Sequence, residues 1–153
     1  MKTIFTRMIF GLFALAFFTS AQCADKGTAD EAVALAKKAV EAIKKDGQEK
    51  AFAQFNDPKG AFVKGDLYVM SYDMEGNNKA HGGNAKLIGK NLIDIKDKNG
   101  VFIVQELIKT AKSPAGKGWV DYVWVNTVTK AIEPKSTYVE KVGDVLVGVG
   151  IYK

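Results

Sequence analysis

The chain has 153 residues, enough for one domain with a hydrophobic core of its own. It carries 22 Lys and Arg against 17 Asp and Glu, and Arg7 is its only arginine. Planar arginine side chains favour phosphate and guanine recognition, so a mild lysine excess argues against a nucleic-acid partner. One histidine and one cysteine also leave no ligand set for zinc, iron or haem, and we expect no metal and no cofactor.

Residues 1–24 have the pattern of a secretory signal peptide. Lys2 and Arg7 supply positive charge ahead of an apolar run, Met8–Phe18. This run is too short to cross a bilayer, which needs about 20 apolar residues. We therefore expect an exported protein, periplasmic or secreted, whose working part is a single domain at 25–153. Loss of Lys2 and Arg7 leaves 20 basic against 17 acidic residues, a net charge of +3.

Cys23 lies at the expected cleavage region, where small residues allow a cut after Ala21 or after Cys23. A lipoprotein signal would place a small residue directly before the cysteine and a leucine-like residue three before it. Gln22 and Ser20 stand there instead, so we do not expect a lipid anchor. A lone thiol also forms no internal disulfide, and the domain must be stable through its core.

Two helices are expected at the start of the domain. Thr28 and Glu31 have the spacing of a capping box, and apolar residues then recur every three or four positions as far as Asp46-Gly47. A shorter helix, Gln48–Phe55, follows and ends before the helix-breaking sequence at 56–58. The first helix is amphipathic and should cover one face of a sheet.

The middle of the chain predicts two strands and one further helix. A strand is expected from Gly65 to Asp73, then a turn, and a short returning strand at Asn78–His81. A partly apolar connection leads to a helix at Val101–Lys112. The segment Asp94–Gly100 has oxygen side chains at spacings faintly like a calcium loop, but no Glu stands at the twelfth position, and we interpret it as a turn.

The last third predicts three strands, Gly118–Val125, Ile132–Val142 and Asp144–Tyr152, the last two joined tightly at Gly143-Asp144. Two strands, a crossover with a helix and three meandering strands predict an α+β fold with a five-stranded antiparallel sheet. With the first helix on one face, the other face, under the 82–116 crossover, is the expected place for a cavity.

Seven segments in order along the chain resemble a single Cache domain of the second type, a PAS-like sensor domain. They are Phe55–Gly60, Gly65–Val69, Ala80-His81, Leu87–Leu92, Gly118–Trp124, Glu133–Val139 and Gly148–Tyr152. The resemblance covers nearly all of the domain.

This resemblance implies an extracytoplasmic domain that binds a small organic anion such as a short carboxylate. Relatives of this type usually form the outer part of chemoreceptors and histidine kinases, so a membrane protein of either class is the implied signalling partner. The sequence ends at Lys153 with no second membrane segment or output region, and we expect a free-standing, diffusible binder. The oligomeric state is left open.

Lys135 is the first candidate ligand-binding residue, because the resemblance places a lysine there that could pair with a carboxylate. Tyr138 lies three residues later, so in a regular strand the two side chains point to opposite faces. Both could line one cavity only if Pro134 marks a bulge or a late strand start. Otherwise one of them must be dropped.

Aromatic residues and the single histidine complete the candidate set. Tyr122 and Trp124 share one face of their strand, and Trp119 lies on the other; either face could meet the cavity. His81 precedes Gly82-Gly83, which could let the backbone approach a ligand, and its titration could make binding pH-sensitive. Tyr68, on a face with Met70 and Tyr72, is a further candidate, although such a face is more often plain core.

The sequence thus predicts a binding module and not an enzyme. No Ser-His-Asp arrangement or buried pair of carboxylates stands out, and Asp121 within a strand is weak evidence for a base. The alternative is a structural or interaction protein of the same fold, whose cavity its own side chains fill and whose partner is a membrane receptor or a second copy.

Overall fold

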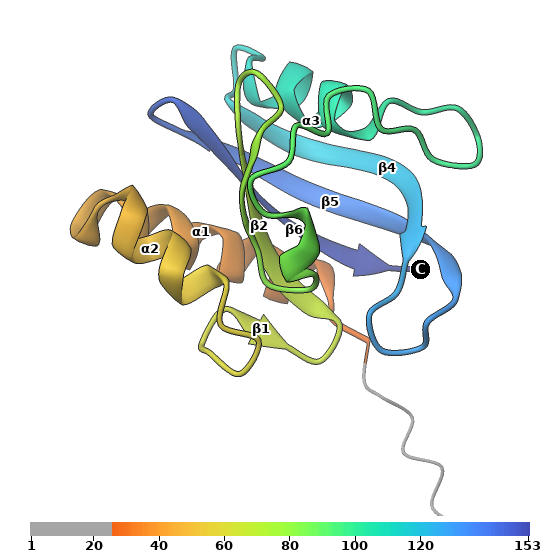
Figure 1. The fold of residues 1–153 in the computed structure, drawn as a ribbon, viewed down its shortest axis with the longest axis horizontal. Helices are drawn as coiled ribbons and strands as arrows, with labels where there is room; N and C mark the ends of the chain where they lie inside the picture. Colours follow the sequence, from red (N-terminus) through yellow and green to blue (C-terminus); the bar gives the residue numbers. More distant parts are fainter. Residues whose placement is uncertain (1–25) are drawn as a thin grey trace, which may run out of the picture.

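The computed structural model describes residues 26–153, so the expected signal peptide and Cys23 lie outside the described residues. The described chain forms one antiparallel sheet with helices on both faces, which confirms the α+β fold (Figure 1). None of the helices between residues 26 and 153 combines the length and apolar character needed to span a membrane.

The first helix, α1 (Ala29–Asp46), begins at the predicted capping box. The Thr28 side chain accepts a hydrogen bond from the Glu31 backbone N–H, and the Glu31 carboxylate accepts one from the Thr28 N–H at 3.0 Å. Gly47 ends the helix at φ +81°, a conformation that glycine adopts without strain, and α2 (Gln48–Phe55) follows at once. Both helices match their predicted ranges.

Replacement of Thr28 by Ala should lower the free energy of unfolding by about 1 kcal/mol, because it leaves helix N–H groups without the capping oxygen. Urea denaturation of the domain measures this change. Thr28→Ser keeps the hydroxyl and should remain within about 0.5 kcal/mol of the wild type. Equal losses in the two variants would show that the methyl group, and not the cap, matters here.

The sheet has the strand order β1-β2-β6-β5-β4, and β3 pairs with β2 on the edge away from β6, farther along the strand than β1. All pairings are antiparallel. The strands are β1 (Val63–Lys64), β2 (Leu67–Asp73), β3 (Asn78–His81), β4 (Lys117–Val125), β5 (Ile132–Val142) and β6 (Val145–Tyr152). The five predicted strands are all present.

The sixth strand, β1, was not expected from the sequence. Gly65-Asp66, predicted as the start of a strand, is the two-residue turn of a hairpin in which Lys64 pairs with Leu67. Gly65 has φ +61°, which an extended strand does not contain. The turn therefore separates Val63-Lys64 as a strand of its own.

The two faces of the sheet carry different cores. On one face, α1 and α2 pack against residues such as Val69, Val147 and Val149. On the other face, α3 (Ile103–Ala111) packs against residues such as Met70 and Leu146. Figure 1 shows α3 and the connection after β3, which includes the short helix η1 (Ala85–Leu87), on the side of the sheet opposite α1 and α2.

Candidate functional site

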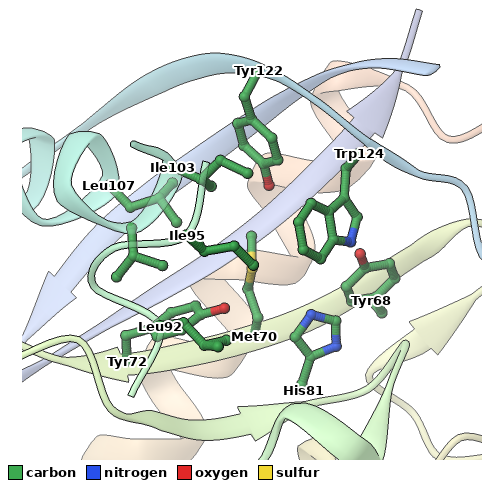
Figure 2. Close-up of a pocket in the computed structure, with 11 residues that line it drawn as sticks. Tyr68, Met70, Tyr72, His81, Leu92, Ile95, Ile103, Leu107, Tyr122 and Trp124 are labelled. Carbon is green, nitrogen blue, oxygen red and sulfur yellow. The ribbon is translucent and has the colours of Figure 1, made fainter. Parts of the chain in front are cut away.

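A cavity lies between the α3 face of the sheet and the crossover, on the face that the sequence predicted. Its floor comes from alternate residues of β2 and β4 and from the end of β3, and its cover comes from α3 and the connection before it. The floor residues are Tyr68, Met70, Tyr72, His81, Tyr122 and Trp124, and the cover residues are Leu92, Ile95, Ile103, Val104 and Leu107 (Figure 2).

The cavity is nearly closed in this structure. The volume open to the centre of a water molecule is about 10 Å³, which is room for about one water. An organic ligand would therefore need part of the lining to move outward. Leu92 and Ile95 belong to irregular chain between η1 and α3, whereas the floor residues sit on paired strands. The cover therefore includes lining residues that lie outside the paired strands.

Polar groups gather at one end of the cavity. Figure 2 shows Trp124 with its indole nitrogen turned toward the Tyr68 hydroxyl, and His81 beside Tyr68. The Tyr68 and His81 ring centroids are 4.9 Å apart. His81 Nδ1 accepts a hydrogen bond from the Asn84 backbone N–H at 3.0 Å, so the neutral ring carries its proton on Nε2. This end therefore offers N–H and O–H donors, as an anion requires.

His81 does not titrate near neutral pH. Burial, together with the nearby positive charge of Lys135, lowers the pKa of His81 to about 3. The ring is thus a neutral donor at physiological pH, and the predicted role of His81 as a pH switch is corrected. The glycines after it serve the protein's own packing, because a Cβ at Gly83 would lie 2.8 Å from the Tyr68 ring and one at Gly82 would lie 2.9 Å from the Phe55 carbonyl oxygen.

Lys135 lies behind this polar end and is 1 % exposed. Its Nζ donates hydrogen bonds to the hydroxyl oxygens of Tyr68 at 2.7 Å and Tyr152 at 3.1 Å. The same ammonium lies 4.1 and 4.4 Å from the centroids of those two rings. Lys135 does not line the cavity itself. The Tyr68 hydroxyl, which does, connects it to the cavity.

Gly150 allows this position of the lysine. A Cβ at residue 150 would lie 2.1 Å from Lys135 Cε and 2.6 Å from Thr137 Oγ1, so only glycine leaves room for the lysine to cross the strand. Within residues 26–153 no carboxylate oxygen lies within 4.0 Å of Lys135 Nζ. Burial lowers the pKa of Lys135 to about 7, and the more distant charge of Asp66 opposes this only in part.

Tyr122 and Trp124 point to the cavity from β4, as the predicted alternation allows. The Tyr122 hydroxyl is within 2.8 Å of Thr137 Oγ1, and burial raises the pKa of Tyr122 well above its usual value. Tyr122 therefore stays neutral and is held by its partner on β5. Trp124 is partly buried, and its indole nitrogen is turned toward the polar end of the cavity (Figure 2).

Tyr138 and Trp119 lie away from the cavity, and we remove both from the candidate site. Pro134 introduces no bulge: β5 keeps continuous register with β4 and β6, so Lys135 and Tyr138 point to opposite faces. Tyr138 belongs to the core under α1, and its ring lies 5.5 Å from that of Trp119. Trp119 is 41 % exposed on the same face.

Two residues of the site were missed by the sequence reasoning. The Tyr152 hydroxyl accepts a hydrogen bond from Lys135, and Gly150 leaves room for the lysine side chain. Both residues lie on the cavity face of β6. Because every second residue of a strand shares a face, the sequence could have predicted that Gly148, Gly150 and Tyr152 lie on the same face of the last strand. Nothing in the sequence pairs that face with Lys135, because the pairing depends on the register between β5 and β6.

The segment Asp94–Gly100 is a turn before α3, as predicted. Asp97 Oδ1 accepts hydrogen bonds from the Asn99 and Val101 backbone N–H groups at 2.8 and 2.9 Å, and Oδ2 accepts one from the Val123 N–H of β4 at 2.9 Å. These bonds lower the pKa of Asp97. The side chain thus fastens the cavity cover to β4 and is engaged in protein hydrogen bonds.

Comparisons with known proteins agree with this architecture. The family model of single Cache domain 2 matches residues 19–153. A methyl-accepting chemotaxis protein from Vibrio parahaemolyticus RIMD 2210633 has 30% sequence identity and a TM-score of 0.69, with 80% of this chain and 86% of that chain covered. A Cache chemosensory domain described for carboxylic acid recognition has 22% identity and a TM-score of 0.68, with 80% and 91% covered, and supports the fold.

Among curated proteins, the sensor histidine kinase MctS of Rhizobium johnstonii (strain DSM 114642 / LMG 32736 / 3841) is 36% identical over 89 residues. The match covers 57% of this chain and 19% of that kinase, so the chain spans about a fifth of its length. Cache domains are extracytoplasmic, non-catalytic sensor domains of chemotaxis proteins and histidine kinases, and they bind small ligands. The chain, with this sheet order, cavity and family match, belongs to the single Cache domain 2 family.

Proposed function

We propose that this protein is an exported binding domain for a short carboxylate with an apolar tail. The observation that carries the proposal is the buried Lys135 ammonium, which has two tyrosine hydroxyls as partners and no carboxylate within 4.0 Å in residues 26–153. A buried charge without a counter-charge is costly, and an anion at the cavity end would offset that cost.

The two ends of the cavity favour one chemical class of ligand. The carboxylate would bind at the Tyr68 hydroxyl, the His81 Nε2–H and the Trp124 indole N–H, with Lys135 polarising the Tyr68 hydroxyl from behind. Apolar side chains from α3 and the connection would enclose the tail. Since the lining contains no carboxylate to pair with an ammonium group and no lysine or arginine to pair with a second carboxylate, it favours a monocarboxylate over an amino acid or a dicarboxylate. The carboxylate recognition described for a Cache domain of the same fold is consistent with this choice.

The second candidate function is the interaction module predicted above, in which the cavity takes no ligand. One observation favours it: the exposed large apolar side chains of the described residues, Trp119, Val125, Val128 and Ile132, all lie on the β4–β5 hairpin and its turn. A partner that covers this hairpin would remove them from water. The implied partner of the binding domain is a membrane chemoreceptor or a histidine kinase, and that of the interaction module is a membrane receptor or a second copy of the chain.

A thermal-shift panel on residues 25–153 tests the proposal. Acetate, propionate and butyrate at millimolar concentration should raise Tm by several degrees, while succinate and alanine should not. A ligand at 100 times its Kd adds about 2.7 kcal/mol to stability, which is several degrees for a domain of this size. Sodium chloride at matched ionic strength is the control. No shift with any acid, together with a dimer in light scattering, would instead support the interaction module.

A further inference from the structure

We propose that the ligand carboxylate enters this site together with a proton, which Lys135 takes up, so that Lys135 and not His81 makes binding depend on pH. The inference rests on the proposed function, since it concerns the same cavity. Its basis is the geometry around the Lys135 amine, which is buried and donates hydrogen bonds to two tyrosine hydroxyls. The third N–H of the ammonium has no carboxylate partner in the described chain.

The groups that face Lys135 come from every strand around it, and few of them carry charge. The facing groups are Tyr68 on β2, His81 on β3, Tyr122 on β4, Tyr152 on β6 and Asp66 in the β1–β2 turn. The three tyrosines have raised pKa values and stay neutral. His81, with a pKa of about 3, is neutral as well.

Among the groups that the structure describes, Asp66 is the carboxylate whose charge acts on the amine, and it is already engaged in another hydrogen bond. Its Oδ1 accepts a hydrogen bond from the Gly27 backbone N–H at 2.8 Å, and no contact within 4.0 Å joins it to Lys135. On α3, Glu106 and Lys109 pair with each other at the surface, 3.2 Å apart. The amine therefore loses its proton near pH 7 in the empty protein.

A bound carboxylate would change this balance. An opposite charge at about 4–6 Å raises the pKa of a lysine by about 1–3 pH units. Between pH 7 and that higher value, the free site is mostly neutral and the occupied site is protonated, so each binding event takes one proton from solution. Below about pH 6 both states hold the proton and binding is independent of pH, as long as the acid itself stays ionised.

The sign of the effect follows from linkage. Because the complex binds more protons than the free protein above pH 7, Kd should rise by up to tenfold per pH unit there. Titration calorimetry, with whichever of acetate, propionate or butyrate stabilises the protein most, measures the proton count directly from the dependence of binding heat on the buffer's ionisation heat. We expect about zero protons at pH 5.5 and about 0.4–0.9 at pH 8, depending on how far the bound carboxylate raises the pKa of Lys135.

Two variants separate Lys135 from the histidine. Lys135→Arg keeps a charge that does not titrate, so it should bind with no proton uptake and a flat Kd between pH 6 and pH 8. His81→Gln keeps a side-chain donor, and whatever its affinity, its Kd should retain the wild-type slope with pH. A slope that persists in Lys135→Arg, or disappears in His81→Gln, would overturn the inference.

A measurement on the empty protein keeps the inference testable if arginine does not fit the site. Carbon-13 NMR of the lysine Cε groups, assigned by comparison with Lys135→Arg or, if that does not fold, Lys135→Met, should show Lys135 titrating near pH 7. If no acid binds but this titration is seen, the proposed function fails, while the assignment of Lys135 as a group that takes up a proton near pH 7 holds. If acids bind without proton uptake at pH 8, the proposed function stands and the inference fails.

Discussion

Lys135→Met should make the empty domain more stable and at the same time abolish its response to carboxylates. At pH 6 the wild type holds a buried ammonium without a carboxylate partner, and replacement of a buried charge by a packed apolar side chain gains about 1–3 kcal/mol in such sites. The gain is reduced because the Tyr68 hydroxyl loses its lysine partner. Urea denaturation at pH 6 measures the stability, and the thermal-shift panel measures the lost response.

The stability gain should itself depend on pH. Lys135 has a folded-state pKa of about 7 against an ordinary value of 10.5, so between these limits the unfolded chain binds the extra proton and wild-type stability rises with pH. The methionine variant lacks this term, and its advantage should shrink toward zero by pH 9. His81 adds little to this comparison above pH 6, because burial keeps its folded-state pKa low even without the charge of Lys135.

Lys141→Met is the matched control, because Lys141 lies on the same strand and is exposed. It should change stability by less than about 0.5 kcal/mol and leave the acid response intact. A Lys135→Met protein that is less stable than the wild type at pH 6 by 2 kcal/mol or more would mean that the lysine serves the fold through its tyrosine bonds. It would then not be an unmatched charge kept for a ligand.

Gly150→Ala should destabilise the domain by about 2–3 kcal/mol and weaken carboxylate binding. The new methyl group would overlap the Lys135 side chain and the Thr137 hydroxyl, both of which are buried on paired strands and have little room to shift. Overpacking of this kind typically costs about 1–3 kcal/mol. Urea denaturation measures the loss, and calorimetry at 20 °C, where the variant remains folded, measures binding.

Gly148→Ala provides the comparison on the same strand and face. Its Cβ would lie 3.1 Å from the Thr137 methyl and 3.2 Å from the Met70 methyl, so no contact is as close as those at Gly150, and the flexible Met70 can relieve the second. We expect a loss of about 1 kcal/mol or less and a smaller effect on binding. If the two alanine variants behave alike, the close approach of Gly150 to Lys135 does not set the position of the amine.

Local chemistry made most of the fold readable from the sequence. The Thr28–Glu31 capping box and the Gly143-Asp144 turn each satisfy their hydrogen bonds or dihedral angles within a few residues, so their structures do not depend on distant parts of the chain. The strand at 63–64 was missed because Gly65-Asp66 is compatible with a strand end or a turn. The φ of +61° at Gly65 depends on the pairing of Lys64 with Leu67 across the turn.

For the site, the sequence determined the residue types and, through strand alternation, which of them share a face. It placed Tyr122 with Trp124 and showed that a regular strand at Pro134 would separate Lys135 from Tyr138. Only the tertiary structure decided that the strand is regular, that Gly150 and Tyr152 stand beside Lys135, and that no carboxylate of the described chain does. The physical reason is that burial and charge pairing are sums over neighbours from four strands, and no local pattern in the chain specifies which neighbours meet.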